Sequence, residues 1–304
     1  MRPFRFAVQT RALDDHAELV AAARQAEALG YDELYSYDHV GAVDPFIPLM
    51  VAAEATTRLR VGPLVLNNEF HQPALLARTA ATVDRLTGGR LVLGLGTGYA
   101  QSEHDAIGLQ LRDPGPRVSR FAESVSVLRS LLDTGASHLD GTHHQIRLDD
   151  LGIRPAQGRV PFLIGGHGRR VVRIAARYAD IFQFTGLSHG EDGRPSAGGF
   201  ALEALRERAA WLAEAAGDRV DAIERSALVQ MTDIAADATN RADEAAERFH
   251  VDVHVIHDTP FVLMGSVEQI VDKLQRLRLD LGISHYVIRD PEGFAPVAAL
   301  LTGR

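Results

Sequence analysis

Residues 60–98 read RVGPLVLNNEFHQPALLARTAATVDRLTGGRLVLGLGTG, and this stretch decides the fold. Arg60–Leu66 is a short apolar run with branched side chains, which predicts a strand. Ala74–Leu86 has apolar residues at helical spacing, and Gly88-Gly89 ends the predicted helix. Arg90–Leu95 is a second apolar run. Because neither run alternates with polar residues, both predict strands covered on two faces, as in a parallel sheet.

The same strand–helix unit repeats along the chain in both directions. The predicted strands are Phe4–Gln9, Glu33–Tyr37, Arg60–Leu66, Arg90–Leu95, Pro161–Ile164, Ile181–Phe184, Ser226–Thr232 and Ser284–Ile288. The predicted helices are Asp14–Leu29, Phe46–Arg58, Ala74–Leu86, Arg117–Asp133, Arg169–Tyr178, Phe200–Ala216, Asn240–Phe249 and Val267–Leu281. Eight such strands fit an α/β fold that closes into a (β/α)8 TIM barrel better than an open doubly wound sheet. No linker rich in Pro, Gly or Ser divides the chain, so residues 1–304 are expected to form a single domain.

Three segments fall outside this repeat. Ser137–Leu148 predicts a β-hairpin that turns at Asp140-Gly141. Leu187–Gly199 contains Gly, Ser and His and predicts a mobile loop, which we hypothesise covers the barrel mouth as a lid. Residues 250–257 alternate Val, Asp and His, which favours a strand or a loop.

Composition excludes several classes of protein and site. The 304 residues are 46% hydrophobic and 24% charged, as in ordinary globular proteins. The absence of cysteine excludes disulfides, thiolate nucleophiles and Cys-ligated zinc. The net charge is −8 and the basic residues are scattered, so nucleic-acid binding is not expected. No apolar run reaches the length of a membrane span, so no membrane association and a cytoplasmic location are expected.

Two hydrolase signatures are also absent from the sequence. No His-x-His follows the first predicted strand, and there is no Gly-x-Ser-x-Gly elbow. Neither a metal site nor a serine nucleophile is therefore expected.

Candidate functional residues follow the carboxyl ends of the predicted strands, where barrel enzymes carry their active sites. They follow the second to fifth strands and are Asp38, His39, Asn67, Gly96, Thr97, Gly98, Tyr99, Gly165, Gly166, His167, Gly168 and Arg169. We expect these residues to gather at one mouth of the barrel.

The segment Gly165–Arg170 reads GGHGRR and opens a predicted helix. Its glycines let the backbone approach a ligand, and the helix start directs N–H groups and a partial positive charge at the mouth. A phosphate would satisfy both features and the two arginines. The alternative is a tight strand-to-helix turn with arginines that face solvent.

The segment Gly94–Gly98 has the spacing Gly-x-Gly-x-Gly, and no helix follows it directly. It is therefore a weak match to a dinucleotide fingerprint. We interpret it as bare backbone against which a planar ring can lie, with Thr97 and Tyr99 beside the ring. The alternative is a simple loop.

Asp38-His39 places a carboxylate beside an imidazole at a strand end. Histidine titrates near neutral pH and can pass a proton during hydride transfer. The alternative is a capping aspartate and a packing histidine.

These positions carry a resemblance to the luciferase-like monooxygenase superfamily. The matching segments are residues 60–70, 72–78, 80–84, 87–90 and 94–98, together with Asp38-His39, residues 164–168, 173–180, 265–270 and 282–285. The order of the segments matches the superfamily, and they span nearly the whole chain. Within it the chain looks most like the branch that uses coenzyme F420, a 5-deazaflavin.

The resemblance implies a set of roles for the candidate residues. His39 would exchange the proton and Asp38 would lie with it beside the ring, while C5 of the deazaflavin gives or takes hydride. Leu64-Val65 would be a non-proline cis peptide that places Val65 against the ring. Asn67 and Thr97 match ring or ribityl contacts, and Gly165–Arg169 match the phosphate loop. The substrate would be a small organic molecule, and the chain would form a homodimer.

The sequence departs from this branch at two places. Tyr99 stands where several relatives have an acidic residue or Trp, and His71-Gln72-Pro73 stands where many have Arg-His-Pro. Tyr99 argues against a sugar-phosphate substrate. The resemblance also leaves two alternatives open: an FMN-dependent monooxygenase supplied by a partner reductase, and a non-catalytic flavin-binding relative.

Overall fold

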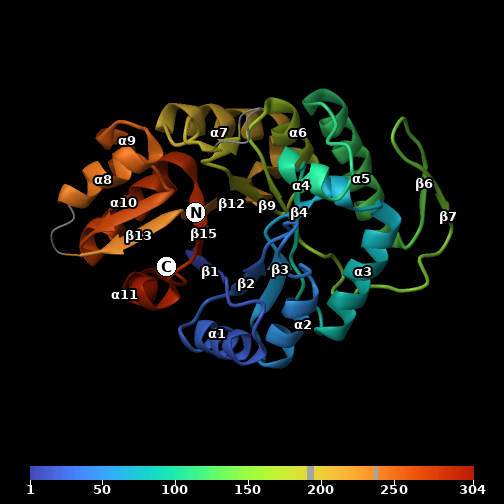
Figure 1. The fold of residues 1–304 in the computed structure, drawn as a ribbon, viewed down its shortest axis with the longest axis horizontal. Helices are drawn as coiled ribbons and strands as arrows, with labels where there is room; N and C mark the ends of the chain where they lie inside the picture. The colour runs from blue at the N-terminus through green and yellow to red at the C-terminus, as the bar shows by residue number, and fades with distance from the viewer. Residues whose placement is uncertain (190–194, 236–238) are drawn as a thin grey trace.

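The computed structural model describes residues 1–189, 195–235 and 239–304. Its central feature is a ring of parallel strands enclosed by helices (Figure 1). The strands are β1 Arg5–Gln9, β2 Glu33–Ser36, β3 Arg60–Pro63, β4 Leu66–Asn67, β5 Leu93–Gly96, β8 Phe162–Gly165, β9 Ile181–Phe184, β12 Glu224–Leu228 and β15 Ile283–Ile288. They are hydrogen-bonded in the order β3-β2-β1-β15-β12-β9-β8-β5-β4.

The ring closes at β3 and β4, which are two halves of one predicted strand. The peptide bond Leu64-Val65 between them is cis, as the resemblance implied. β4 pairs with β5, and an isolated parallel bridge joins Val61 to Leu91. Counting β3 and β4 as one strand gives an eight-stranded closed barrel, so the predicted TIM barrel is confirmed.

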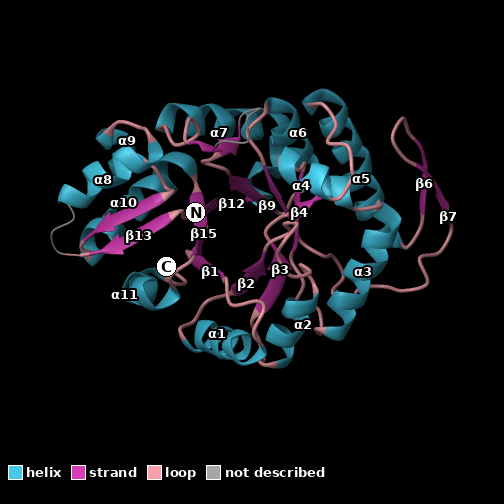
Figure 2. Ribbon diagram, viewed as in Figure 1, coloured by secondary structure: helices cyan, strands magenta, loops and turns pink. Residues whose placement is uncertain are grey.

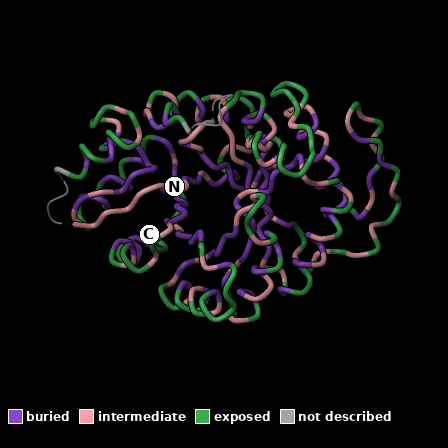
Figure 3. The backbone as a smooth tube through the Cα atoms, in the orientation of Figure 1, coloured by how far each residue is buried: buried purple, intermediate pink, exposed green. Residues whose placement is uncertain are grey.

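Helices cover the outside of the barrel (Figure 2). They are α1 His16–Ala28, α2 Ile47–Glu54, α3 Pro73–Leu86, α4 Gln101–Ala106, α5 Pro114–Thr134, α6 Arg169–Tyr178, α7 Leu202–Ala216, α8 Thr239–Phe249, α9 Val253–Asp258, α10 Val267–Leu281 and α11 Pro291–Leu301, with 3-10 turns at Asn68–Phe70 and Gly217–Ala222. Buried residues follow the strands and the inner faces of the helices (Figure 3). None of the helices in the described part of the chain is long and apolar enough to cross a bilayer.

Three elements lie outside the barrel wall. The predicted hairpin is present as β6 Ser137–Asp140 and β7 Gln145–Leu148, and it stands off beyond α3 and α5 (Figure 1). In the predicted loop Leu187–Gly199, β10 Ser188–His189 pairs with β11 Pro195–Ser196, and residues 190–194 lie outside the described residues. At the opposite edge of the molecule, β13 Met231–Ile234 and β14 Val262–Gly265 form a small parallel sheet.

Several expectations were wrong in detail. Predicted strand Ser226–Thr232 is split, because its second half leaves the barrel as β13 to pair with β14, a strand that the sequence did not indicate. Residues 253–258 form α9 and not a strand or loop, because only Ile256 is buried and one helical face is enough to bury it. Helices α4 and α11 were not predicted.

The barrel interior has an apolar middle layer. Its side chains come from strands around the ring and form a core cluster separate from the one beneath the helices: Ala7, Tyr35, Leu64, Val92, Leu163, Ile181 and Val287. Below it, near the strand starts, Glu33 accepts from Nε2 of His285 at 3.0 Å and also pairs with Arg5. Arg5 also reaches Glu224 at 2.7 Å. The amino end of the barrel is therefore sealed by a buried polar network.

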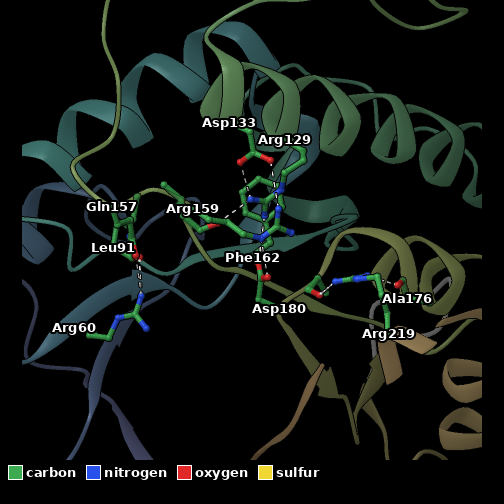
Figure 4. Close-up of polar contacts among 12 residues, drawn as sticks. Arg60, Leu91, Arg129, Asp133, Gln157, Arg159, Phe162, Ala176, Asp180 and Arg219 are labelled. Carbon is green, nitrogen blue, oxygen red and sulfur yellow. Dashed lines mark hydrogen bonds and ion pairs between the residues drawn. The ribbon is translucent and has the colours of Figure 1, made fainter. Parts of the chain in front are cut away.

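A second polar cluster ties the loops at the strand starts (Figure 4). Asp180, just before β9, accepts hydrogen bonds from Arg159 at 3.0 Å and Arg129 at 3.3 Å, and also from the N–H of Phe162. The Arg129 guanidinium lies 3.5 Å from the Phe162 ring centroid. In barrel enzymes the residues at this end of the strands contribute to stability, and active sites lie at the other end.

Candidate active site

A cavity of about 600 Å³ opens at the carboxyl ends of the strands. Its lining is Gln9, Arg11, Tyr37, Asp38, His39, Leu64, Val65, Leu66, Asn67, Gly96, Thr97, Gly98, Tyr99, Ala100, Glu103, Arg117, Gly165, Gly166, His167, Gln183, Phe184, Thr185, Gly186, Leu187, Ser188, Leu228, Gln230 and Arg289. Each strand of the ring contributes residues at or just beyond its carboxyl end. All the candidate residues except Gly168 and Arg169 are among them.

The cis segment between β3 and β4 is held from two sides. Gln9 Nε2 donates to the carbonyl of Leu64 at 3.1 Å. Asp38 Oδ2 accepts from the N–H of Asn67 at 2.9 Å and from Nε2 of His71 at 3.0 Å. Asp38 is therefore placed to position β4, and its carboxylate has partners other than the neighbouring His39.

Glycines keep the adjacent wall bare. A Cβ on Gly96 would lie 2.6 Å from Cγ2 of Val65, and a Cβ on Gly98 would overlap Oδ1 of Asn67. The Asn67 side chain is itself fixed, since Oδ1 accepts from the N–H of Glu69 at 3.0 Å and Nδ2 lies 3.2 Å from Nε2 of buried His104. The backbone of β5 can pack against the cis segment only without side chains.

His39 forms a pair with Glu103, a residue of α4 that the sequence did not single out. Nδ1 of His39 lies 2.6 Å from Oε1 of Glu103, and Oε2 accepts from the N–H of Val40 at 3.2 Å. The ring of Tyr99 meets the His39 imidazole edge-on at 6.0 Å between centroids. Burial and the Glu103 carboxylate raise the pKa of Tyr99, so its phenol stays protonated near neutral pH.

The β8 loop contributes Gly165, Gly166 and His167 to the wall. Nε2 of His167 lies 2.7 Å from the carbonyl of Leu187. Buried Arg208 donates to the carbonyls of Thr185 at 2.6 Å and Gly199 at 2.7 Å, which closes the base of the 187–199 segment. The hydroxyl of Thr185 is buried and has no hydrogen-bond partner among the described residues.

Gly168 and Arg169 lie away from the cavity lining. Gly168 is the N-cap of α6, and Arg169 pairs with Glu214 of α7 at 2.8 Å. The first turn of α6 thus directs Arg169 along the outer surface. Phosphate binding by the remaining part of this loop stays a prediction.

Cavity residues that sequence reasoning missed include Glu103, Arg11, Gln183, Gln230 and Arg289. Arg11, Gln230 and Arg289 do follow strand ends, so the rule that function follows the strands could have found them. Glu103 had no such signal, because α4 was not predicted. No group of His, Asp and Glu side chains in the described ranges could hold a metal ion.

A family model described as luciferase-like monooxygenase matches residues 1–285. The chain belongs to this family. The match agrees with the resemblance carried by the segments found in the sequence.

Among curated relatives of this luciferase-like chain, a 5,10-methylenetetrahydromethanopterin reductase from Archaeoglobus fulgidus is 31% identical over 163 residues, which cover 54% of this chain and 47% of that protein. An F420-dependent glucose-6-phosphate dehydrogenase from Microbacterium testaceum is 30% identical over 172 residues, which cover 54% and 51%. The chain therefore spans about half the length of these relatives.

The fold matches over the full length. The coenzyme F420-dependent tetrahydromethanopterin reductase from Methanopyrus kandleri superposes with a TM-score of 0.76 at 19% identity, covering 99% of this chain and 98% of that chain. At this identity the likeness concerns the fold.

Proposed function

We propose that this chain is a coenzyme F420-dependent oxidoreductase that transfers hydride between the deazaflavin C5 and a small organic substrate. One observation carries the proposal: the His39–Glu103 pair and the bare wall of Val65, Gly96 and Gly98 line the same cavity. The similarity to a relative described as F420-dependent supports the choice of coenzyme.

The residues in the cavity fit a flavin-like coenzyme. Gly96 and Gly98 pack closely against Val65 and Asn67, and as glycines they put no side chain into the cavity. Thr185 is among the lining residues, and its buried hydroxyl has no hydrogen-bond partner in the described residues, so it is a candidate donor to a ligand. Val65, Asn67 and Thr97 would hold the ring, while Gly165, Gly166 and His167 would lie near the phosphate.

When bound, the coenzyme supplies a carbon that gives or takes hydride. His39 would supply or accept the proton that accompanies it. Glu103 orients the imidazole through Nδ1, which leaves Nε2 for proton exchange. Tyr99 lies edge-on to that imidazole, and burial and Glu103 raise the pKa of its phenol.

The test is equilibrium binding of the purified chain to F420 and to FMN side by side, by fluorescence and calorimetry. We expect F420 to bind at least roughly tenfold more tightly than FMN, a difference of about 1.4 kcal/mol. Arg78→Gln, an exposed change on α3, serves as the control variant. Binding of neither cofactor would overturn the proposal.

The alternative is an FMN-dependent monooxygenase, which the description of the matching family favours. A preference for FMN in the same experiment would establish it and direct the search to a partner reductase. The homodimer, the cytoplasmic location and a lid formed by residues 187–199 stay predictions.

A further inference from the structure

Three neighbouring strands, β12, β15 and β1, present polar side chains to one side of the cavity. The guanidinium of Arg289, one residue beyond β15, lies between two amide oxygens. Its Nε donates to Gln9 at 3.0 Å, and NH1 donates to Gln230 at 2.9 Å. A guanidinium has five N–H donors, so most of the donors of Arg289 are left for other partners. Both protein partners are neutral.

Among the residues that the structure describes, no carboxylate balances the positive charge on this side. In the described residues Arg289 pairs with no carboxylate. The side chain of Arg11, also in the lining, has neither a hydrogen bond nor an ion pair there, and only its carbonyl accepts, from the N–H of Leu13. Burial, together with the nearby charge of Arg11, lowers the pKa of Arg289. Two cations that face one cavity favour an anion between them.

The carboxylates that line the cavity have hydrogen-bond partners other than Arg289. Asp38 accepts from Asn67 and His71, and Glu103 accepts from His39 and Val40. Asp290, next to Arg289 in the chain, caps α11 by accepting from the N–H of Gly293 at 3.0 Å. None of them neutralises Arg289.

The strand order separates this side from the wall proposed for the coenzyme. In the closed ring β15 lies across from β5, β1 across from β8, and β12 across from the β3–β4 strand. The wall proposed for the coenzyme is formed by residues at the carboxyl ends of β4, β5 and β8. A group held by Arg289 would therefore face the coenzyme across the mouth, where a substrate has to lie.

Resting on the proposed function, we infer that the substrate is a small organic anion whose carboxylate or phosphate is bound by Arg289 and Arg11. The planar fork of Arg289 suits two oxygens of one such group. Leu228 and Tyr37 give the rest of the substrate apolar contacts.

The experiment compares three probes of similar shape by calorimetry: benzoate, phenyl phosphate and the neutral benzamide. At least one anion is expected to bind about tenfold more tightly than benzamide to the parent chain, since hydrogen bonds between ionised groups are the stronger ones. The tighter anion identifies the group as a carboxylate or a phosphate. In Arg289→Gln the preference is expected to fall to about twofold or less.

Controls separate this inference from the proposed function. Arg289→Gln should keep F420 affinity within about threefold, and Arg78→Gln should change neither measurement. Loss of F420 affinity in Arg289→Gln would assign Arg289 to the coenzyme and overturn the inference. A parent chain that fails to bind F420 would overturn the proposed function, while the ratio of anion to benzamide affinity still tests the subsite.

Folding is checked by urea unfolding of each variant. Should Arg289→Gln not fold, Arg11→Gln at an exposed position provides the second variant, with an expected loss of anion preference of about threefold. Equal binding of all three probes to the parent chain would contradict the inference.

Discussion

Gly98 lies where the loop after β5 passes closest to Asn67. Its φ of 78° is in the left-handed region, which residues other than glycine rarely adopt. A Cβ there would also overlap Oδ1 of Asn67, which is held by its bond from Glu69. Both the backbone conformation and the available space therefore require glycine at this position.

Gly98→Ala is expected to lower the free energy of unfolding by about 1–3 kcal/mol and to weaken F420 binding, because Asn67 must move. Urea unfolding and coenzyme fluorescence measure the two effects. Gly108→Ala is a matched control, since Gly108 has a φ of 71° and no heavy atom within 4 Å of an added Cβ. Gly108→Ala should lower the free energy of unfolding but leave F420 binding unchanged. Equal coenzyme affinities for the two variants would contradict a role for the Gly98–Asn67 contact.

At the scale of single elements, the residues at the two ends of α10 define where this helix begins and where it ends. Ser266 and Gln269 form a capping box at its start, and Gly282 ends it with a φ of 70°. The interior of α10 contains a buried lysine. Lys273, the only lysine of the sequence, is buried and donates to the carbonyls of Ile256 at 3.0 Å and Val262 at 2.7 Å. It links α10 to α9 and to β14.

Burial lowers the pKa of Lys273 from 10.5 to about 7. Between these two pH values the unfolded chain holds a proton that the folded protein has released, so the free energy of unfolding should rise with pH. Lys273→Met is expected to remove this part of the rise. Urea unfolding at several pH values between about 7 and 10 measures it.

Gln275→Met, an uncharged and exposed change on the same helix, is the control and should keep the slope. Parallel pH profiles for the parent and Lys273→Met would show that Lys273 stays protonated in the folded protein. The carbonyls of Ile256 and Val262 lose a donor in this variant, so its overall stability is also expected to fall.

At the scale of the whole molecule, polar groups occupy both ends of the barrel and an apolar layer separates them. At the amino end, burial alone would raise the pKa of Glu33, but His285 and Arg5 together hold it well below its ordinary value. At the carboxyl end, the cavity carries arginines and the His39–Glu103 pair. This arrangement matches other barrels of this kind, in which residues at the amino end of the strands contribute to stability and active sites lie at the carboxyl end.

Glu33→Gln is expected to cost about 3–5 kcal/mol of unfolding free energy, because it removes the buried carboxylate partner of His285 and one of the two buried carboxylates that pair with Arg5. F420 affinity should stay unchanged, since the network lies at the opposite end from the cavity. Urea unfolding and coenzyme binding give the two readouts, with exposed Glu54→Gln as the control. A loss of unfolding free energy no larger than in the control would mean that the ion pairs of Glu33 contribute little to stability.

The sequence by itself determined the barrel and the mouth at which most candidate residues gather. The predicted bounds of α6, β9 and α10 agree with the structure, because apolar period, glycine stops and caps act within a few residues. The rule that function follows the strand ends placed most candidate residues in the cavity lining.

Only the tertiary structure decided which side chains meet. Asp38 and His39 are adjacent in sequence, yet one contacts His71 and the other contacts Glu103 on an unpredicted helix. Gln9 and Arg289 lie at opposite ends of the chain and meet because β1 pairs with β15. The physical reason is that ring closure and strand register set these neighbours, and neither is encoded in the local periodicity of the chain.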